Sequence, residues 1–224
     1  MKLFRSNLMR LTRPPLPAQV KDDPVHVRIR DVHKAYGDHQ VLKGVSLDIH
    51  RGKTNLIIGP SGSGKTVLMR QLIRLETPDA GELFVNGLDF AKLEGLNLAS
   101  MRRTFGMVFQ MSALFDSMTV FDNVAFPLRE HTDLPRKEIR ERVMEKLGAL
   151  GVAAAAHKLP AQLSGGMQKR VAVARAMILE SEILIYDEPT TGLDPITTEM
   201  VDDLIVQAEE MFGVTSIVIS HDMA

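Results

Sequence analysis

The sequence predicts an α/β fold with a parallel β-sheet, and three features support this fold class. Apolar segments typical of strands, at residues 182–186 and 215–220, alternate with segments whose apolar residues recur at helical spacing. A glycine-rich turn follows one strand-like segment and precedes a helical one. The composition is that of a globular protein, because 45% of the 224 residues are apolar and 25% are charged. A chain of this length can bury a sizeable core.

Antiparallel strands are expected near the start of the chain. Residues 25–30 and 45–49 alternate between apolar and polar side chains, as half-exposed strands do. Residues 82–85 lie between turn signals, of which Asn86 and Gly87 form the second, and this arrangement predicts a hairpin. These segments predict an antiparallel β flank beside the parallel core.

The parallel core is expected to begin at residues 55–58, a strand that leads into the glycine-rich turn. Residues 65–75 then carry apolar side chains at helical spacing. From about residue 91 to 165 the pattern becomes helical, which predicts an inserted α-helical subdomain. Its clearest helix, over 136–150, is bounded by proline near its start and glycine just past its end.

The last third of the chain returns to alternating helices and strands. A helix is predicted over 169–179, followed by the strand at 182–186. Asp194 begins a further helix that ends at Gly213, ahead of the strand at 215–220. Five apolar residues of that helix are expected to face inward: Met200, Leu204, Ile205, Ala208 and Met211.

Charge and cysteine content exclude several classes of protein. The chain has 27 basic and 28 acidic residues, a net charge of −1, so it has no general attraction to nucleic acid. It has no cysteine, which excludes disulfides and thiol catalysis. No apolar segment approaches the length of about 20 residues that spans a membrane.

Residues 1–23 are predicted to form a tail ahead of one domain over residues 24–224. Four basic and no acidic residues stand among the first 20, without the apolar run of a secretory signal. Two interpretations remain open for this tail. It is either a loose, solvated segment or a segment that touches an anionic membrane surface.

The glycine-rich turn fits the phosphate-binding pattern G-x-x-x-x-G-K-[ST], between a strand and a helix. Glycines allow backbone N–H groups to turn toward phosphate oxygens, and the helix N-terminus adds its positive dipole end. Lys65 is expected to reach the β- and γ-phosphates, and Thr66 to ligate Mg²⁺. The predicted nucleotide-binding residues of this turn are Gly59, Pro60, Ser61, Gly62, Ser63, Gly64, Lys65 and Thr66.

Two acidic residues end the apolar strand at 182–186. Carboxylates at the C-terminal end of a parallel strand lie where such sheets bind ligands. Asp187 is therefore expected to hold Mg²⁺, and Glu188 to polarise an attacking water. An acidic pair after a strand is often only a loop, and the phosphate-binding turn favours the functional interpretation.

A second glycine-rich turn, LSGG, opens the helix that follows residue 163. Ser164, Gly165 and Gly166 precede Gln168 in this turn, and their N–H groups are able to bind phosphate. Taken alone, the turn fits a plain helix N-cap equally well. Its meaning depends on the other motifs.

The order of the motifs resembles that of the nucleotide-binding subunits of ABC transporters. The resemblance rests on the two glycine turns, Gln110, the ILIYDEP strand, Asp194 and His221, and it covers residues 24–224. It implies an ABC ATPase: a P-loop NTPase core with an antiparallel β flank and an inserted helical subdomain. It also implies ATP and Mg²⁺ as cofactors.

The resemblance further implies roles for individual residues. Tyr36 resembles the aromatic residue that stacks on adenine, although a strand-end aromatic is the plainer interpretation. Gln110 resembles the glutamine that ligates Mg²⁺ and senses the membrane partner, unless it is a solvated loop residue. Ser164, Gly165, Gly166 and Gln168 resemble the signature that caps ATP on an opposing subunit. Asp194 resembles the acid between the two sites, and His221 the histidine at the γ-phosphate. The implied catalytic residues are Glu188, His221, Lys65 and Gln110.

These roles imply a head-to-tail dimer with two ATP molecules between its subunits. Residues 112–132 look like the same region of Mce-associated phospholipid-transport ATPases. That match implies a membrane permease, Mce-domain and STAS-domain partners, and a peripheral position on the cytoplasmic face of a Gram-negative inner membrane. A subset of apolar residues over 115–121 is a candidate groove for a permease helix. Amino-acid importers share the catalytic motifs, so import of a small solute remains the alternative.

Two further classes of ABC protein fit the sequence less well. A soluble ABC protein acting on DNA or ribosomes usually carries two such domains or a long coiled coil, and this chain has neither. A non-hydrolysing regulatory subunit is disfavoured by the intact Lys65, Asp187, Glu188 and His221. Because members of the family continue well beyond the residue that matches His221, we expect the sequence to be truncated at its C-terminus and the fragment to be less stable.

Overall fold

The computed structural model describes residues 23–110 and 112–221, which form two β-sheets and their helices. The first sheet is antiparallel, with the strand order β2-β1-β4-β5. Its strands are β1 (Val25–Tyr36), β2 (His39–His50), β4 (Ala80–Val85) and β5 (Leu88–Asp89). β4 and β5 form the predicted hairpin around Asn86 and Gly87.

The second sheet is parallel, as predicted, with the strand order β3-β8-β7-β6. Its strands are β3 (Thr54–Ile58), β6 (Phe105–Phe109), β7 (Ile183–Asp187) and β8 (Thr215–Ser220). The register pairs Ile58 with Ser220, and Asp187 with both Ile219 and Phe109. All four strands therefore end at the same edge of the sheet.

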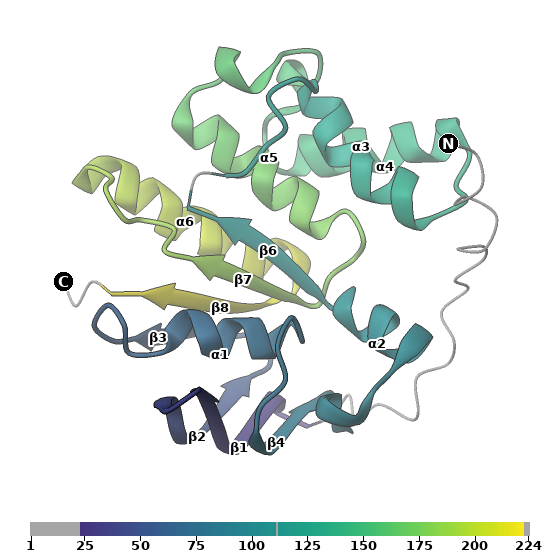
Figure 1. Ribbon diagram of the computed structural model, residues 1–224. Coiled ribbons are helices and arrows are strands. Elements are labelled where there is room, and N and C mark those ends of the chain that lie inside the picture. Colours follow the sequence, from purple (N-terminus) through teal and green to yellow (C-terminus); the bar gives the residue numbers. More distant parts are fainter. Residues whose placement is uncertain (1–22, 111, 222–224) are drawn as a thin grey trace.

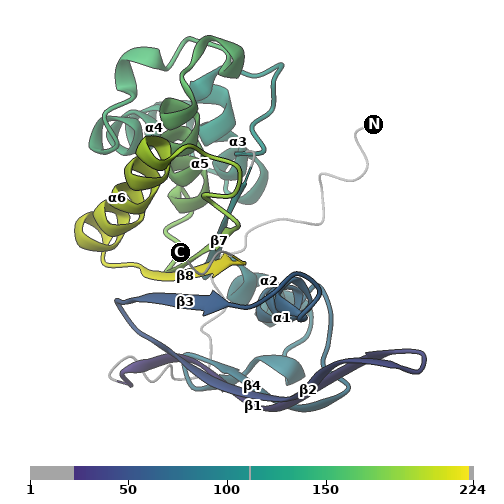
Figure 2. The same ribbon diagram turned by 90° about the vertical axis from the view of Figure 1, so that its left-hand side faces the viewer.

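Helices cover both faces of the parallel sheet. α1 (Lys65–Leu72) lies between the two sheets, with α2 (Gly95–Arg102) beside it (Figure 2). The opposite face carries α3 (Val120–His131), α4 (Arg136–Ala149), α5 (Gly165–Met177) and α6 (Pro195–Phe212) (Figure 1). Short 3₁₀ turns at Phe90–Lys92, Ala153–Ala155 and Pro160–Gln162 complete the elements. No helix in the described part is long and apolar enough to cross a membrane.

Two apolar cores result from this layering, one on each face of the parallel sheet. Successive residues of β7 pack alternately into one core and the other, because successive strand side chains point to opposite faces. Ile183 and Ile185 pack toward α1 and the antiparallel sheet, whereas Leu184 and Tyr186 pack toward α3, α5 and α6. The strand is buried on both faces, as in other parallel sheets covered by helices.

Two expectations from the sequence are wrong in detail. Residues 91–165 are not all helical, because β6 lies among them and pairs with β7. A five-residue apolar run has no diagnostic periodicity, so the strand could not be distinguished from helix. Met200 and Met211 are exposed, at 54% and 49%, rather than inward. They lie on the margin of the buried stripe of α6, which runs through Leu204 and Ala208.

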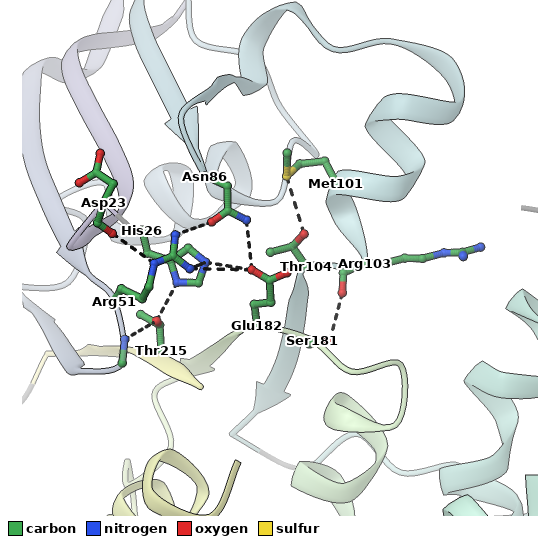
Figure 3. A network of polar contacts seen from close by, with 11 residues as sticks. Asp23, His26, Arg51, Asn86, Met101, Arg103, Thr104, Ser181, Glu182 and Thr215 are labelled. Atoms are coloured by element: carbon green, nitrogen blue, oxygen red, sulfur yellow. Dashed lines mark hydrogen bonds and ion pairs between the residues drawn. The ribbon is translucent and has the colours of Figure 1, made fainter. Parts of the chain in front are cut away.

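A polar network joins the two sheets at the edge where the parallel strands begin (Figure 3). His26 of β1 contacts Thr215 of β8 (Nδ1 to Oγ1, 2.7 Å) and Glu182 beside β7 (Nε2 to Oε2, 3.4 Å). Arg51 donates to Asn86 (Nη2 to Oδ1, 2.6 Å), and Asn86 donates to Glu182 (Nδ2 to Oε2, 3.1 Å). The hydrogen bonds with His26 and then Asn86 lower the pKa of Glu182 to about 2.

The lowered pKa of Glu182 predicts a pH-dependent contribution to stability. Glu182→Gln should lower the free energy of unfolding at pH 7 by about 2 kcal/mol, because a charge-assisted hydrogen-bond acceptor is lost. Since the ordinary pKa is 4.5 and the folded value is about 2, the difference from wild type should shrink as pH falls through this interval. Urea unfolding at several pH values measures both effects.

Glu180→Gln is the matched control, because Glu180 lies two residues away, is largely exposed and pairs with Arg142 at the surface. That variant should change stability little. A cost for Glu182→Gln that stays constant down to pH 2 would contradict the role assigned to the network.

Candidate functional site

The candidate site lies at the edge where the four parallel strands end. The loop after β3 carries the phosphate-binding pattern, and Gln110 follows β6. Asp187 ends β7, and His221 follows β8. The parallel register therefore gathers segments that are far apart in the sequence, as predicted for this sheet.

The loop Gly59–Thr66 has a backbone that only glycine accommodates at its end. Gly64 has φ of +96°, and a Cβ atom there would lie 2.9 Å from Cδ2 of Leu42. Gly64 also stands at the N-cap of α1, where no side chain caps the helix. The first N–H groups of α1 are thus available to an anion.

The Lys65 ammonium folds back over this loop. It donates to the carbonyl oxygens of Gly59 (2.6 Å) and Pro60 (3.1 Å). A compact cation is thereby held by two backbone carbonyls of the loop, where phosphate oxygens would compete for it. The loop fits a nucleotide phosphate in both shape and charge.

Asp187 lies between this loop and a second carboxylate. Burial, and then the neighbouring charge of Glu188, raise the pKa of Asp187, while Lys65 opposes the shift. A carboxylate destabilised in this way favours a divalent cation beside it. The described residues contain no group of three or more acidic or histidine side chains that would hold a metal alone. Mg²⁺ held by Asp187, Thr66 and Gln110 would therefore take its other ligands from phosphate and water.

Glu188 is held by two side chains that can donate hydrogen bonds to its carboxylate. Thr191 donates from Oγ1 to Oε2 (2.7 Å), and Nδ1 of His221 lies 2.6 Å from the same oxygen. Its backbone has φ of +50°, and its N–H donates to the carbonyl of Ile219 at 2.9 Å. Burial alone would raise the pKa of Glu188, but these hydrogen bonds outweigh it and lower the pKa. The carboxylate is ionised at neutral pH, as a proton acceptor must be.

Gln110 lies in the loop after β6, whereas Asp194 lies in the loop after β7 that also carries Glu188. The Gln110 amide donates from Nε2 to the carbonyl of Thr191 (3.2 Å). Asp194 caps α6, accepting from the N–H of Thr197 (3.1 Å) and from its hydroxyl (2.6 Å). Gln110 therefore joins the strand-end cluster, whereas the Asp194 carboxylate is engaged by its own helix.

The signature turn lies apart from this cluster. Ser164 caps α5 by accepting from the N–H of Met167 (3.4 Å), and Gln168 donates to the carbonyl of Pro160 (3.0 Å). α5 lies on the opposite face of the parallel sheet from α1 (Figure 2). Within residues 23–110 and 112–221, no hydrogen bond joins Ser164, Gly165 or Gly166 to the phosphate-binding loop.

Tyr36 ends β1, with 46% of its surface exposed. Its hydroxyl donates to Glu76, and the Lys34 ammonium lies 5.8 Å from its ring. The ring is thus accessible to a flat ligand. Its contact with adenine stays a prediction.

One residue beside this site, Lys169, was not predicted from the sequence. Lys169 of α5 is 7% exposed, and its ammonium donates to the carbonyls of Gln110 and Pro189. Burial lowers its pKa. Its only signal in the sequence is a Lys-Arg pair before an Ala/Val-rich helical run, which is too general to indicate a site.

Comparison with known proteins identifies the family. The family model described as "ABC transporter" matches residues 42–191, well over half of the chain. The chain belongs to the ABC transporter family. ATP with Mg²⁺ is the cofactor of this family, which confirms the cofactors and the fold class expected from the motifs.

Several curated relatives are similar over most of this chain. The intermembrane phospholipid transport system ATP-binding protein MlaF is 44% identical in Escherichia coli K12 and 41% in Haemophilus influenzae, over 88% of this chain. These alignments cover 73% and 75% of the relatives. The "Probable ribonucleotide transport ATP-binding protein mkl" of Mycobacterium leprae is 39% identical over 89% of this chain. The chain spans only 57% of that relative's length.

Solved structures share the fold. The cbiO1 protein of Clostridium perfringens, part of an ABC transporter complex, is similar with a TM-score of 0.83 and 30% identity, over 89% of this chain and 80% of that one. A dimeric ATP-binding cassette bound to ADP and phosphate matches with a TM-score of 0.73 and 35% identity, over 88% of each chain. Cassettes of this fold therefore dimerise.

The contacts of Glu188 predict the pH dependence of ATP hydrolysis. Thr191→Val removes a donor that stabilises the ionised carboxylate, so the pKa of Glu188 should rise. The acidic limb of the kcat profile should then move to higher pH by up to about one unit. Steady-state phosphate release between pH 4.5 and pH 8 measures this shift, with Thr190→Val as the neighbouring control. An acidic limb at the same pH in both variants would contradict the role of Thr191.

Proposed function

We propose that this chain is the ATP-hydrolysing subunit of an ABC transporter that moves phospholipid between inner and outer membranes. The observation that carries the hydrolytic part is the Glu188–His221 pair beside the phosphate-binding loop. The phospholipid part is supported by 41–44% identity to MlaF proteins over most of the chain.

In this proposal, residues of the loop Gly59–Thr66 bind the ATP phosphates, and Lys65 neutralises the β- and γ-phosphates. Thr66, Asp187 and Gln110 hold Mg²⁺. Glu188 accepts the proton of the attacking water, and His221 orients both the carboxylate and the γ-phosphate. The short contact between Glu188 and His221 supports this division of roles.

A head-to-tail dimer would complete the site. The signature at the start of α5 and the phosphate-binding loop at the start of α1 lie on opposite faces of the parallel sheet (Figure 2). A second copy, facing the first, would present Ser164, Gly165 and Gly166 to the other subunit's ATP. Asp194 would then lie between the two sites.

A permease helix is the partner proposed for the aromatic surface after Gln110. Phe115 is 42% exposed and packs edge-on against Phe126, with the two ring centroids 5.1 Å apart. The Arg175 guanidinium lies 5.7 Å from the Phe115 ring. Aromatic residues and arginine are enriched at the centres of protein interfaces, and an apolar groove is the usual docking site of an amphipathic helix. This surface would hold the subunit at the cytoplasmic face of the inner membrane. The complete complex would also contain Mce-domain and STAS-domain partners.

Import of a small solute is the second candidate, because the relative mkl carries a ribonucleotide transport name at 39% identity. The same catalytic residues would hydrolyse ATP in a phospholipid transporter and in a small-solute importer, so they do not distinguish the two. A pull-down of the tagged chain from detergent-solubilised membranes, with mass spectrometry of its partners, separates them. Mce-domain and STAS-domain partners would support phospholipid transport. A periplasmic solute-binding protein would favour import.

The proposed role of Glu188 as proton acceptor leads to a separate prediction. Glu188→Gln removes the proton acceptor but keeps the side-chain size, so kcat should fall at least about 100-fold. ATP binding, measured by calorimetry, should persist because the phosphate-binding loop is untouched. Turnover equal to that of wild type would remove Glu188 from its proposed role.

A further inference from the structure

Lys169 is a buried cation that the proposed roles leave unused. Its ammonium donates to the carbonyl of Gln110, after β6, and to the carbonyl of Pro189, after β7, at 3.2 Å. No carboxylate among the described residues pairs with it, and burial lowers its pKa. A buried ammonium is costly unless its hydrogen bonds are satisfied, so these carbonyl contacts hold it in place.

A second cation of α5 holds the same segment. Arg175 donates to the carbonyls of Ser112 (3.0 Å) and Ala113 (2.7 Å). These two residues have φ of +58° and +46°, a conformation that non-glycine residues adopt at a cost. The carbonyls of Gln110, Ser112 and Ala113 thus all accept hydrogen bonds from side chains of α5.

The loops that Lys169 touches also touch each other. The Gln110 amide donates to the carbonyl of Thr191, and the Thr191 hydroxyl donates to Glu188. A path of hydrogen bonds therefore runs from Lys169 through Gln110 and Thr191 to the Glu188 carboxylate. Lys169 is the point where both loops meet the signature helix.

We propose that Lys169 is a positioning residue for ATP hydrolysis: its ammonium clamps the loops after β6 and β7 together, which places the Gln110 amide and the Glu188 carboxylate for the reaction. This inference rests on the proposed roles of Gln110 and Glu188. It adds a third residue to Gln110 and Glu188, and this residue lies on α5 rather than on either loop.

The chemistry of lysine suits this task. An ammonium has three donors that can point in different directions, so one side chain reaches carbonyls of two separate loops. An apolar side chain of similar length would fill the volume but leave both carbonyls without this donor. Replacing Lys169 by such a side chain would therefore alter the positions of the two loops while the packing of α5 is kept.

The test compares Lys169→Met and Lys169→Arg with Lys146→Met in the full chain. Lys146 is a suitable control, because it is a half-buried lysine whose ammonium lies 4.3 Å from the Phe212 ring, and burial likewise lowers its pKa. For Lys169→Met we expect kcat to fall about 10- to 100-fold, with the Kd for ATP unchanged. Lys169→Arg keeps cationic donors and should recover part of kcat.

Hydrogen exchange without nucleotide supplies a readout that does not depend on turnover. In Lys169→Met, amides of residues 112–115 and 188–194 should both exchange faster, whereas Lys146→Met should leave both segments as in wild type. Faster exchange in one segment alone, or normal kcat in Lys169→Met, would overturn the clamp. An equal loss of kcat in Lys146→Met would also overturn it.

The outcome for Glu188→Gln separates this inference from the proposed function. If Glu188→Gln is inactive while Lys169→Met turns over normally, only the clamp is wrong. If Glu188→Gln retains full turnover, the proposed role of Glu188 fails, and the exchange measurement still decides whether Lys169 joins the two loops.

Discussion

The parallel register of β3, β8, β7 and β6 is the constraint on which the rest of the structure depends. It ends four strands at one edge, so the loops that follow them meet although their residues lie between positions 59 and 221 of the sequence. Loops so placed carry the phosphate-binding turn, Gln110, Glu188 and His221. Covering helices on both faces make this register stable, because β6, β7 and β8 each bury side chains in two cores.

The two edges of this sheet are electrostatically different. At the edge where the strands begin, hydrogen bonds with His26 and Asn86, together with the charge of Arg51, hold the pKa of Glu182 at about 2. At the edge where they end, burial and Glu188 raise the pKa of Asp187. The first edge satisfies its own charges and fixes the antiparallel sheet. At the second edge the Asp187 carboxylate is destabilised, so a cation beside it would gain by binding there.

Local patterns made most of the fold and the motif residues predictable. The phosphate-binding loop, the acidic strand end and the helix caps at Ser164 and Asp194 each depend on neighbours within a few residues. β6 was missed because a short apolar run has no diagnostic period. The contacts of Lys169 and the Glu188–His221 pair join residues 20 to 59 positions apart, so they depend on the packed fold. No spacing rule in one sequence reveals them.

α5 connects these observations, because one stiff element of 13 residues carries several of them. Its first turn bears Ser164 at the cap, its flank bears Lys169, and Arg175 follows near its end. A short helix moves as a unit, and packed elements shift between discrete arrangements rather than deform. Phe115 is thus joined, through its contact with Arg175, to the same helix that carries Lys169 and the cap at Ser164. The helix proposed to face an opposing subunit thus also contacts the loops that carry Gln110 and Glu188.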